Sequence, residues 1–170
     1  MSLTARELWT VLHGLVFGSV FLLAFAGGLA GLYSLRPDLV TVAGVQERLR
    51  RLLAGTWILA VVAWITVVSG TYVVYPWYRA GTPDSPRSLL LADPTTKLWH
   101  TFGMEWKEHV GWFAPILATA VAFVVAYYGA QIAEDSRLRR AAMWLFTLAF
   151  LAAGIAGALG AFLNKVAPIR

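Results

Sequence analysis

The sequence predicts an all-α integral membrane protein, a four-helix bundle with up-down-up-down order. Of the 170 residues, 59% are hydrophobic and only 14% are charged, so polar side chains are too few to cover the core of a soluble domain of this length. The apolar residues stand in four long blocks that short polar segments separate. Such blocks are typical of helices whose solvent is lipid, and short connections favour antiparallel neighbours.

We expect a single membrane domain over residues 1–170, because the chain is long enough for one such bundle only. Each apolar block has about 22–28 residues, enough at 1.5 Å per residue to cross a hydrocarbon core of roughly 30 Å. The expected helices cover residues 8–35, 52–75, 106–132 and 138–163.

The first helix is expected to begin at a capping box, in which Thr4 and Glu7 satisfy free backbone N–H groups. Its apolar run stops at Arg36-Pro37-Asp38. Residues 24–26 imitate the cleavage site of a signal peptide, but Glu7 offsets the charge of Arg6 and the run continues to Leu35. We therefore expect a retained helix.

The second helix is expected to follow the basic cluster 48–51, to begin at Leu52 and to be ended by Pro76, which cannot continue a helix without strain. Residues 77–92 hold several prolines and are expected to form a surface segment.

The third helix could begin before the membrane, because Asp93-Pro94 suits an N-cap and a first turn. Its apolar part ends at Ile132, and Pro115 is expected to kink it. The fourth helix follows a short loop and the second basic cluster, 137–140, and runs to Leu163.

The charge pattern indicates a membrane partner. The net charge is +5, but the basic residues flank apolar runs, which suits anionic lipid headgroups rather than nucleic acid. Both arginine clusters fall at one end of the bundle, which we predict to be cytoplasmic in a prokaryotic plasma membrane, with both termini on the opposite face. The absence of cysteine excludes disulfides, thiolate metal sites and covalently attached c-type haem.

Two histidines are expected at matching depth. His13 lies 22 residues before Leu35 and His109 lies 23 residues before Ile132, on helices that run in the same direction. At 1.5 Å per residue their depths differ by about 2 Å. First and third helices are diagonal in an up-down bundle, so the two imidazoles could bind the iron of one b-type haem from opposite sides. The alternative is that each histidine anchors its helix at the headgroups or bonds a neighbouring helix.

A haem at this end would need cations for its propionates, and Lys165 and Lys107 are the candidates. Alternatively, both lysines extend to lipid phosphates.

The segment before His109 permits a second kind of site. His100 and Met104 are four residues apart, as are Glu105 and His109, so each pair shares a helix face. With Glu108, these residues could bind a divalent metal, although helical bundles usually take metal ligands from several helices. Met104 or His100 could also serve as an axial haem ligand.

Other chemistry has little support in the sequence. Aromatic residues near the termini could line a quinone pocket, or could form an interfacial belt; they are Tyr72, Tyr75, Trp77, Trp106 and Trp112. No motif for nucleophilic catalysis or phosphate binding occurs.

The layout of four spans with His13 and His109 resembles that of small four-helix membrane cytochromes b, such as cytochrome b561-like proteins and haem-bearing anchors of respiratory complexes. The resemblance is architectural, and helices 2 and 4 lack the histidines that many such families carry. It implies electron transfer and quinone chemistry.

The sequence hypothesis is therefore a b-type haem subunit that carries electrons, to or from quinone, beside other redox subunits. The alternatives are a cofactor-free structural or assembly subunit, and a small metal-binding or transport protein that uses residues 105–109.

Overall fold

The computed structural model describes residues 3–169, and all regular structure in that part is helical. Four long helices are long and apolar enough to cross a membrane: Ala5–Ser34, Val42–Tyr78, Trp99–Tyr128 and Ser136–Val166. We refer to them as the first to fourth long helices. They confirm the all-α class and the four apolar helices that the sequence predicts.

Three of the long helices contain one turn of π-helix, labelled η. The first consists of α1 (Ala5–Val11), η1 (Leu12–Val16) and α2 (Phe17–Ser34); the second of α3 (Val42–Ser69), η2 (Gly70–Val74) and α4 (Tyr75–Tyr78). The third consists of η3 (Trp99–Met104), α6 (Glu105–Gly111) and α7 (Phe113–Tyr128), and the fourth is α9 (Ser136–Val166). Two short helices lie in the connections, α5 (Pro86–Ala92) and α8 (Gln131–Glu134).

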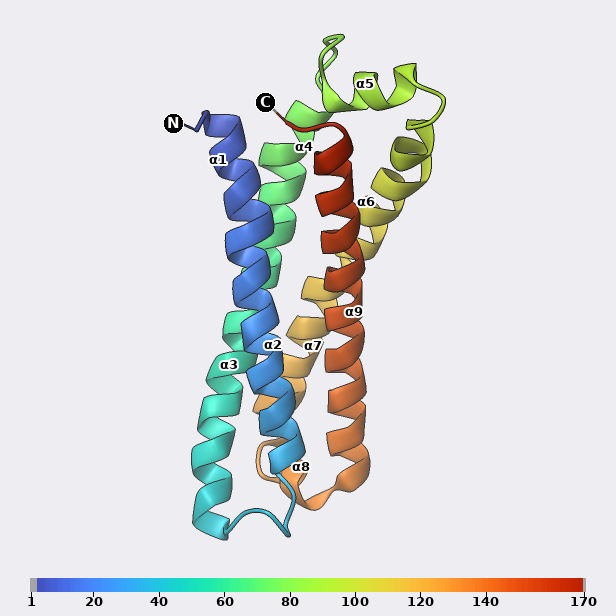
Figure 1. The fold of residues 1–170 in the computed structure, drawn as a ribbon. Coiled ribbons are helices and arrows are strands. Elements are labelled where there is room, and N and C mark those ends of the chain that lie inside the picture. The colour runs from blue at the N-terminus through green and yellow to red at the C-terminus, as the bar shows by residue number, and fades with distance from the viewer. Residues whose placement is uncertain (1–2, 170) are drawn as a thin grey trace.

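The two ends of the bundle differ (Figure 1). Both termini, α4 and α5 lie at one end, called here the terminal end. The turn after α2 and the short helix α8 lie at the other, called here the basic end because it holds both arginine clusters. Near the basic end α2 packs against α3 and α9, and α7 packs against α3 and α9. The first and third long helices are therefore diagonal in the bundle.

The first long helix begins as expected, whereas the second begins earlier than expected. The capping box of Thr4 and Glu7 is present as predicted. The second long helix, however, begins at Val42, not at Leu52, because the Thr41 side chain caps it by accepting from the Gly44 N–H. The cluster 48–51 is thus helical.

Pro76 does not end the second long helix, contrary to expectation. Its ring cannot donate a backbone hydrogen bond and would clash with the carbonyl one turn earlier in a regular α-helix. The wider turn Gly70–Val74 lies immediately before it and changes the backbone spacing there, so the helix continues to Tyr78.

The third and fourth long helices also differ from expectation at their ends, and the fourth, Ser136–Val166, extends beyond the predicted range 138–163. Asp93 holds a turn by accepting from the Thr95 N–H, and the helix begins at Trp99, later than Pro94. It ends at Tyr128, not Ile132, because Gly129 adopts a φ of 48°, which favours glycine. Its α-helical segments are interrupted at Trp112, where Pro115 leaves the carbonyl one turn earlier without a donor.

The apolar interior is divided in two. A large cluster fills the basic half and a smaller one lies at the terminal end, around Tyr78, Leu90 and Met104. In between, η1, η2 and α6 contain no fully buried residue. The level of the bundle where these three segments lie therefore lacks the close apolar packing of the levels on either side.

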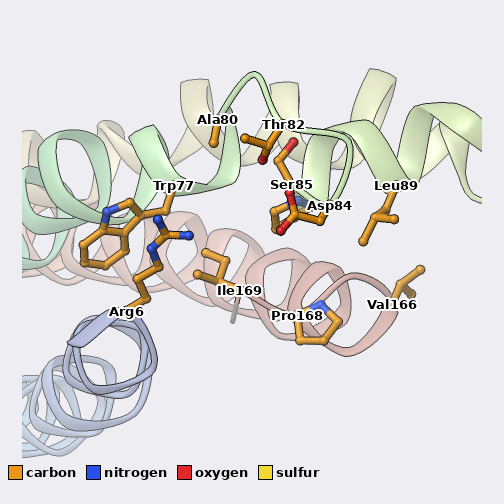
Figure 2. Close-up of a pocket in the computed structure, with 11 residues that line it drawn as sticks. Arg6, Trp77, Ala80, Thr82, Asp84, Ser85, Leu89, Val166, Pro168 and Ile169 are labelled. Carbon is orange, nitrogen blue, oxygen red and sulfur yellow. The ribbon is translucent and has the colours of Figure 1, made fainter. Parts of the chain in front are cut away.

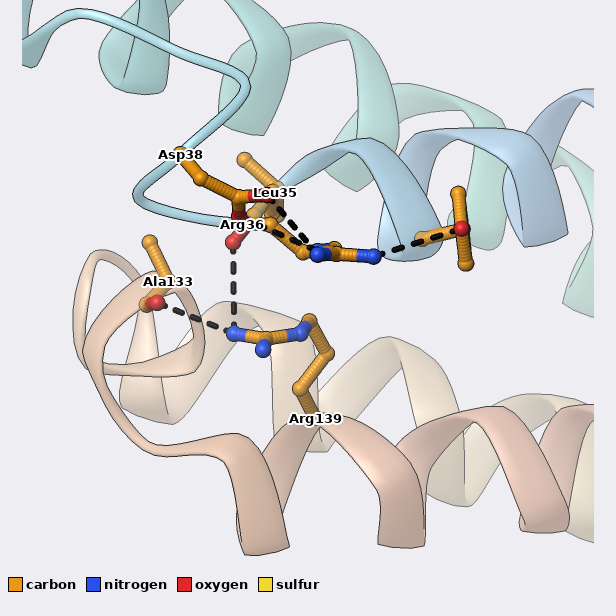
Figure 3. Close-up of polar contacts among 6 residues, drawn as sticks. Leu35, Arg36, Asp38, Ala133 and Arg139 are labelled. Atoms are coloured by element: carbon orange, nitrogen blue, oxygen red, sulfur yellow. Dashed lines mark hydrogen bonds and ion pairs between the residues drawn. The ribbon is translucent and has the colours of Figure 1, made fainter.

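Arg139 closes the basic end of the bundle (Figure 3). Its guanidinium donates to the backbone carbonyls of Leu35, Ile132 and Ala133 at 3.3, 3.0 and 2.9 Å. These carbonyls belong to the turn after α2 and to α8, where regular helix bonds end. One side chain of α9 thus links the end of the first long helix to α8.

Gly28→Ala tests the packing of the large cluster. A Cβ at Gly28 would lie 2.7 Å from the ring of Phe146, which is fully buried and stacked on Phe25. We expect a loss of about 1–3 kcal/mol of stability, as for other overpacked cores, measured by unfolding in detergent. Gly27→Ala is the control, since a Cβ there meets nothing within 4 Å. Equal effects of both variants would contradict this packing.

Asp135→Asn tests the cap of the fourth long helix. The N–H groups of Leu138 and Arg137 bond the Asp135 carboxylate and hold its pKa below the ordinary 3.8. The ionised cap therefore stabilises the fold fully above that pH and is lost as pH falls through the lowered pKa. Asparagine caps without titrating, so the variant should unfold like wild type near neutrality and show a smaller loss of melting temperature in acid. Glu134→Gln, outside the cap, should keep the wild-type acid profile.

Candidate functional site

His13 points into the bundle from the π-helical turn of the first long helix. Its Nδ1 lies 3.3 Å from Oγ of the buried Ser69, and that hydroxyl donates its proton to the carbonyl of Thr66 at 3.0 Å. The hydroxyl oxygen therefore accepts from an Nδ1–H, which leaves the lone pair on Nε2. The ring lies on Gly70, where a Cβ would come within 2.6 Å of Cε1.

The π-helical turns create this contact. His13 is the second residue of η1, and Gly70 is the first residue of η2. Such turns are rare, and they occur often at functional sites because they displace side chains from the regular helical pattern. Two of them meet where an imidazole enters the bundle.

Lys107 reaches the same region from the third long helix. Its side chain packs on Gly160 of α9, where a Cβ would lie 2.8 Å from the Lys107 Cε. A glycine in α9 thus makes room for a cation between the helices.

Glu108 bonds the second long helix. The hydroxyl of Tyr75 donates to Oε2 of Glu108 at 2.9 Å. The other oxygen, Oε1, is buried and has no hydrogen-bond partner among residues 3–169. A buried polar atom without a partner is costly, and such atoms in native proteins usually mark a missing ligand, water or functional strain.

An outer layer of polar contacts covers this region. Arg79 forms an ion pair with Glu105 at 3.3 Å and lies over the Tyr75 ring, 4.9 Å from its centre. Tyr78, the next tyrosine along, shares a hydrogen bond of 2.8 Å with Nδ1 of the buried His100. Both members of the ion pair are about 40% exposed, so this layer faces the terminal surface.

We call the inner group the terminal-end cluster. It joins side chains of three long helices at the level that lacks a close-packed apolar core, and its members are His13, Ser69, Tyr75, Lys107 and Glu108.

The structure does not bring His13 and His109 together. Each residue of an α-helix turns the side-chain direction by about 100°. Lys107 faces α9 and Glu108 faces the second long helix, so His109 faces away from the middle of the bundle. It is exposed, and its Nδ1 bonds the carbonyl of Glu105 one turn earlier at 2.6 Å. The predicted pair of haem ligands is therefore split, with His13 inside and His109 outside.

The other predicted site residues have separate positions. Lys165 is exposed in the last turn of α9, where a cation favours the helix end. Met104 is buried in the smaller apolar cluster. Within residues 3–169 no three metal-ligating side chains come together to hold an ion. His100, Glu105 and Glu108, from the alternative metal set, each bond a different residue.

The aromatic residues near the termini do not form one pocket. Tyr72 and Trp106 are exposed, at 71% and 49%, and Trp112 packs edge-on against Trp64. Only Tyr75 joins the cluster. The quinone pocket stays a prediction.

Sequence reasoning missed Ser69 and Gly70, and it predicted for Gly160 close helix packing but no contact with Lys107. Ser69-Gly70 interrupts an apolar run with a hydroxyl and a missing side chain, and this was the available signal.

A separate cavity of about 450 Å³ opens at the terminal end (Figure 2). Arg6 and Trp77 lie on one side of it and Asp84 with Thr82 on another, while Ile169 and Pro168 close it from the chain end. The hydroxyl of Thr82, and less strongly the charge of Arg6, hold the pKa of the Asp84 carboxyl below its usual range. No member of the terminal-end cluster lines this cavity.

Comparison of the chain with models of protein families, with curated proteins and with solved structures gives no match. The site must therefore be interpreted from its own geometry.

Gly70→Ala tests the position of His13. A Cβ 2.6 Å from the imidazole cannot be accommodated unless the ring moves. In protein labelled with ¹⁵N-histidine, we expect the nuclear magnetic resonance signals of His13 to shift and those of His100 and His109 to stay. Gly55→Ala, in the same helix with nothing within 4 Å, is the control. Unchanged His13 signals in Gly70→Ala would show that the ring lies elsewhere.

Proposed function

We propose that this chain is the membrane subunit of a redox complex, that it crosses the bilayer four times in up-down-up-down order, and that the terminal-end cluster holds a b-type haem. The observation that carries the proposal is that His13 and Lys107, on helices that are diagonal, both turn into the bundle, each packed on a glycine of a neighbouring helix. The cytochrome resemblance in the sequence points the same way.

The inward direction of these groups argues against simple anchoring. Ionisable side chains are costly inside a membrane, and those that persist there usually serve a site or a pathway. An anchoring lysine or histidine would extend to the headgroups. Lys107 packs instead on Gly160, and His13 on Gly70. Both contacts direct the side chains between the helices, where lipid headgroups do not reach.

The donor set fits a haem in part. His13 keeps its Nε2 lone pair because Nδ1–H bonds Ser69, the arrangement that suits an imidazole ligand of iron. Lys107, which also lies between the helices, is the cation that would bind a propionate. When bound, the haem supplies reversible one-electron transfer. His109 would have to leave the Glu105 carbonyl and turn inward to be the second ligand.

The remaining parts of the proposal concern the partners of the chain and its orientation in the membrane. The connections between the long helices are residues 35–41, 79–98 and 129–135. They leave little room for a substrate domain, which favours other redox subunits as partners. Quinone in the membrane is the proposed electron donor or acceptor. The positive-inside rule places the basic end in the cytoplasm of a prokaryotic plasma membrane.

Spectra of the purified protein, oxidised and then reduced with dithionite, test this function. We expect a Soret band and a reduced α band in wild type, loss of most of both in His13→Ala, and their retention in His109→Ala. His109→Ala is the matched control because it removes the same side chain from the exposed side of the bundle.

The other outcomes are equally informative. Loss of the bands in both variants would establish the axial pair that the sequence predicts. Absence of both bands from wild-type protein expressed with haem supplied would overturn the proposal and favour the cofactor-free structural subunit.

A further inference from the structure

A shallow groove runs along the outside of the bundle near the basic end. Its volume is about 360 Å³, and it lies between α2 and α9. Leu29 of α2 forms one wall, and Arg140, Met143, Trp144 and Thr147 of α9 form the other. The groove is far along the chain from the terminal-end cluster and shares no residue with it.

The lining changes in chemistry along the groove. Arg140, Trp144 and Thr147 are spaced by four and three residues and therefore form a stripe along one face of the helix. Over these residues α9 rises by about 10 Å. The guanidinium is nearest the basic end, the indole follows, and the deeper part is apolar apart from Thr147, whose hydroxyl bonds the carbonyl of Met143 at 2.9 Å.

The charge at the outer end of the groove is available to a ligand. Arg140 is exposed, its Nε donates to the Ser136 carbonyl at 3.2 Å, and no ion pair joins it to any residue in the described range 3–169. Its neighbour Arg139 differs, because the Arg139 guanidinium donates hydrogen bonds to backbone carbonyls. The nearest acid in sequence, Asp135, is engaged in capping α9.

We propose that this groove binds one anionic phospholipid. The phosphate lies on the Arg140 guanidinium, Trp144 lies at the boundary between headgroup and acyl chain, and one acyl chain lies against Leu29, Met143 and Thr147. Indoles favour that boundary in bilayers, and basic pockets between helices bind anionic headgroups. Trp144 is 68% exposed, which leaves its ring accessible to lipid.

The order of groups in the groove decides among ligands. A free phosphate would use the guanidinium alone and leave the apolar wall uncovered, whereas a phospholipid matches both ends. A zwitterionic headgroup carries no net charge to complement the arginine. The structure therefore favours a lipid with net negative charge over either competitor.

Native mass spectrometry of the purified full chain tests the proposal, with phosphatidylglycerol and phosphatidylcholine of the same acyl chains added at equal concentration. We expect preferential retention of one phosphatidylglycerol by wild type. Arg140→Gln should weaken its binding about five-fold, the effect of one basic residue at a membrane surface. Inorganic phosphate at the same concentration should neither bind nor compete.

Arg137→Gln is the matched control. It removes the same charge from the same helix, one turn earlier, but Arg137 does not line the groove. We expect it to retain the lipid. Equal losses in Arg137→Gln and Arg140→Gln would overturn the proposal in favour of diffuse surface charge. Equal retention of both lipids by wild type, or full competition by phosphate, would overturn it as well.

A second variant tests the apolar wall. Leu29→Trp places a large ring in the groove without changing charge, so it should reduce binding while the Arg140 guanidinium stays in place. Unchanged binding in this variant would show that the acyl chain does not use the groove. Neither variant touches the terminal-end cluster, so haem spectra of these proteins should match wild type whichever way the lipid result falls.

Discussion

The backbone hydrogen bond is the constraint on which this structure depends. In the hydrocarbon core of a membrane no water is present to satisfy a free N–H or carbonyl, so a chain must satisfy these groups internally. Four continuous helices meet this requirement along their length. Two of the difficult places are the proline in the second long helix and the turns at the basic end, and the chain resolves both of these locally. Around Pro76 the helix widens into a π-helical turn, and Arg139 bonds the carbonyls that the ends of helices leave free.

The same π-helical turn has a consequence for the site. A π-helical turn adds a residue to the helix and rotates every side chain beyond it by roughly 100° relative to a regular α-helix. Ser69 and Gly70 stand where this turn begins, and His13 stands in the corresponding turn of the first long helix. The π-helical turn that accommodates Pro76 therefore also places Gly70 where the His13 ring packs. This explains why polar side chains gather between the two apolar clusters, with Tyr75 at the border of the smaller one.

Sequence reasoning predicted the long helices better than the direction of their side chains. Hydropathy and capping residues predicted the four helices, and the capping box of Thr4 and Glu7 is present. Counting residues placed His13 and His109 at similar depth, since rise per residue is nearly constant. The direction of a side chain, by contrast, depends on every irregularity in the helix before it. The turn η3, immediately before α6, was not predictable from residue types, and His109 follows it. Lys107 faces the interior of the bundle, in the direction in which His109 was expected to face.

The arginines show why composition alone cannot assign roles at the basic end. Arg139 and Arg140 are adjacent and chemically identical, but their side-chain directions differ by a rotation of about 100° around the helix axis. Arg139 faces the bundle and replaces missing backbone donors. Arg140 is exposed beside an apolar groove. Rules that count positive charges treat the two as equal contributions to membrane orientation. In this chain Arg139 stabilises the fold, and Arg140 keeps its charge accessible to an anionic partner. The sequence therefore shows how much positive charge lies at this end, and only the packing shows how much of that charge is exposed.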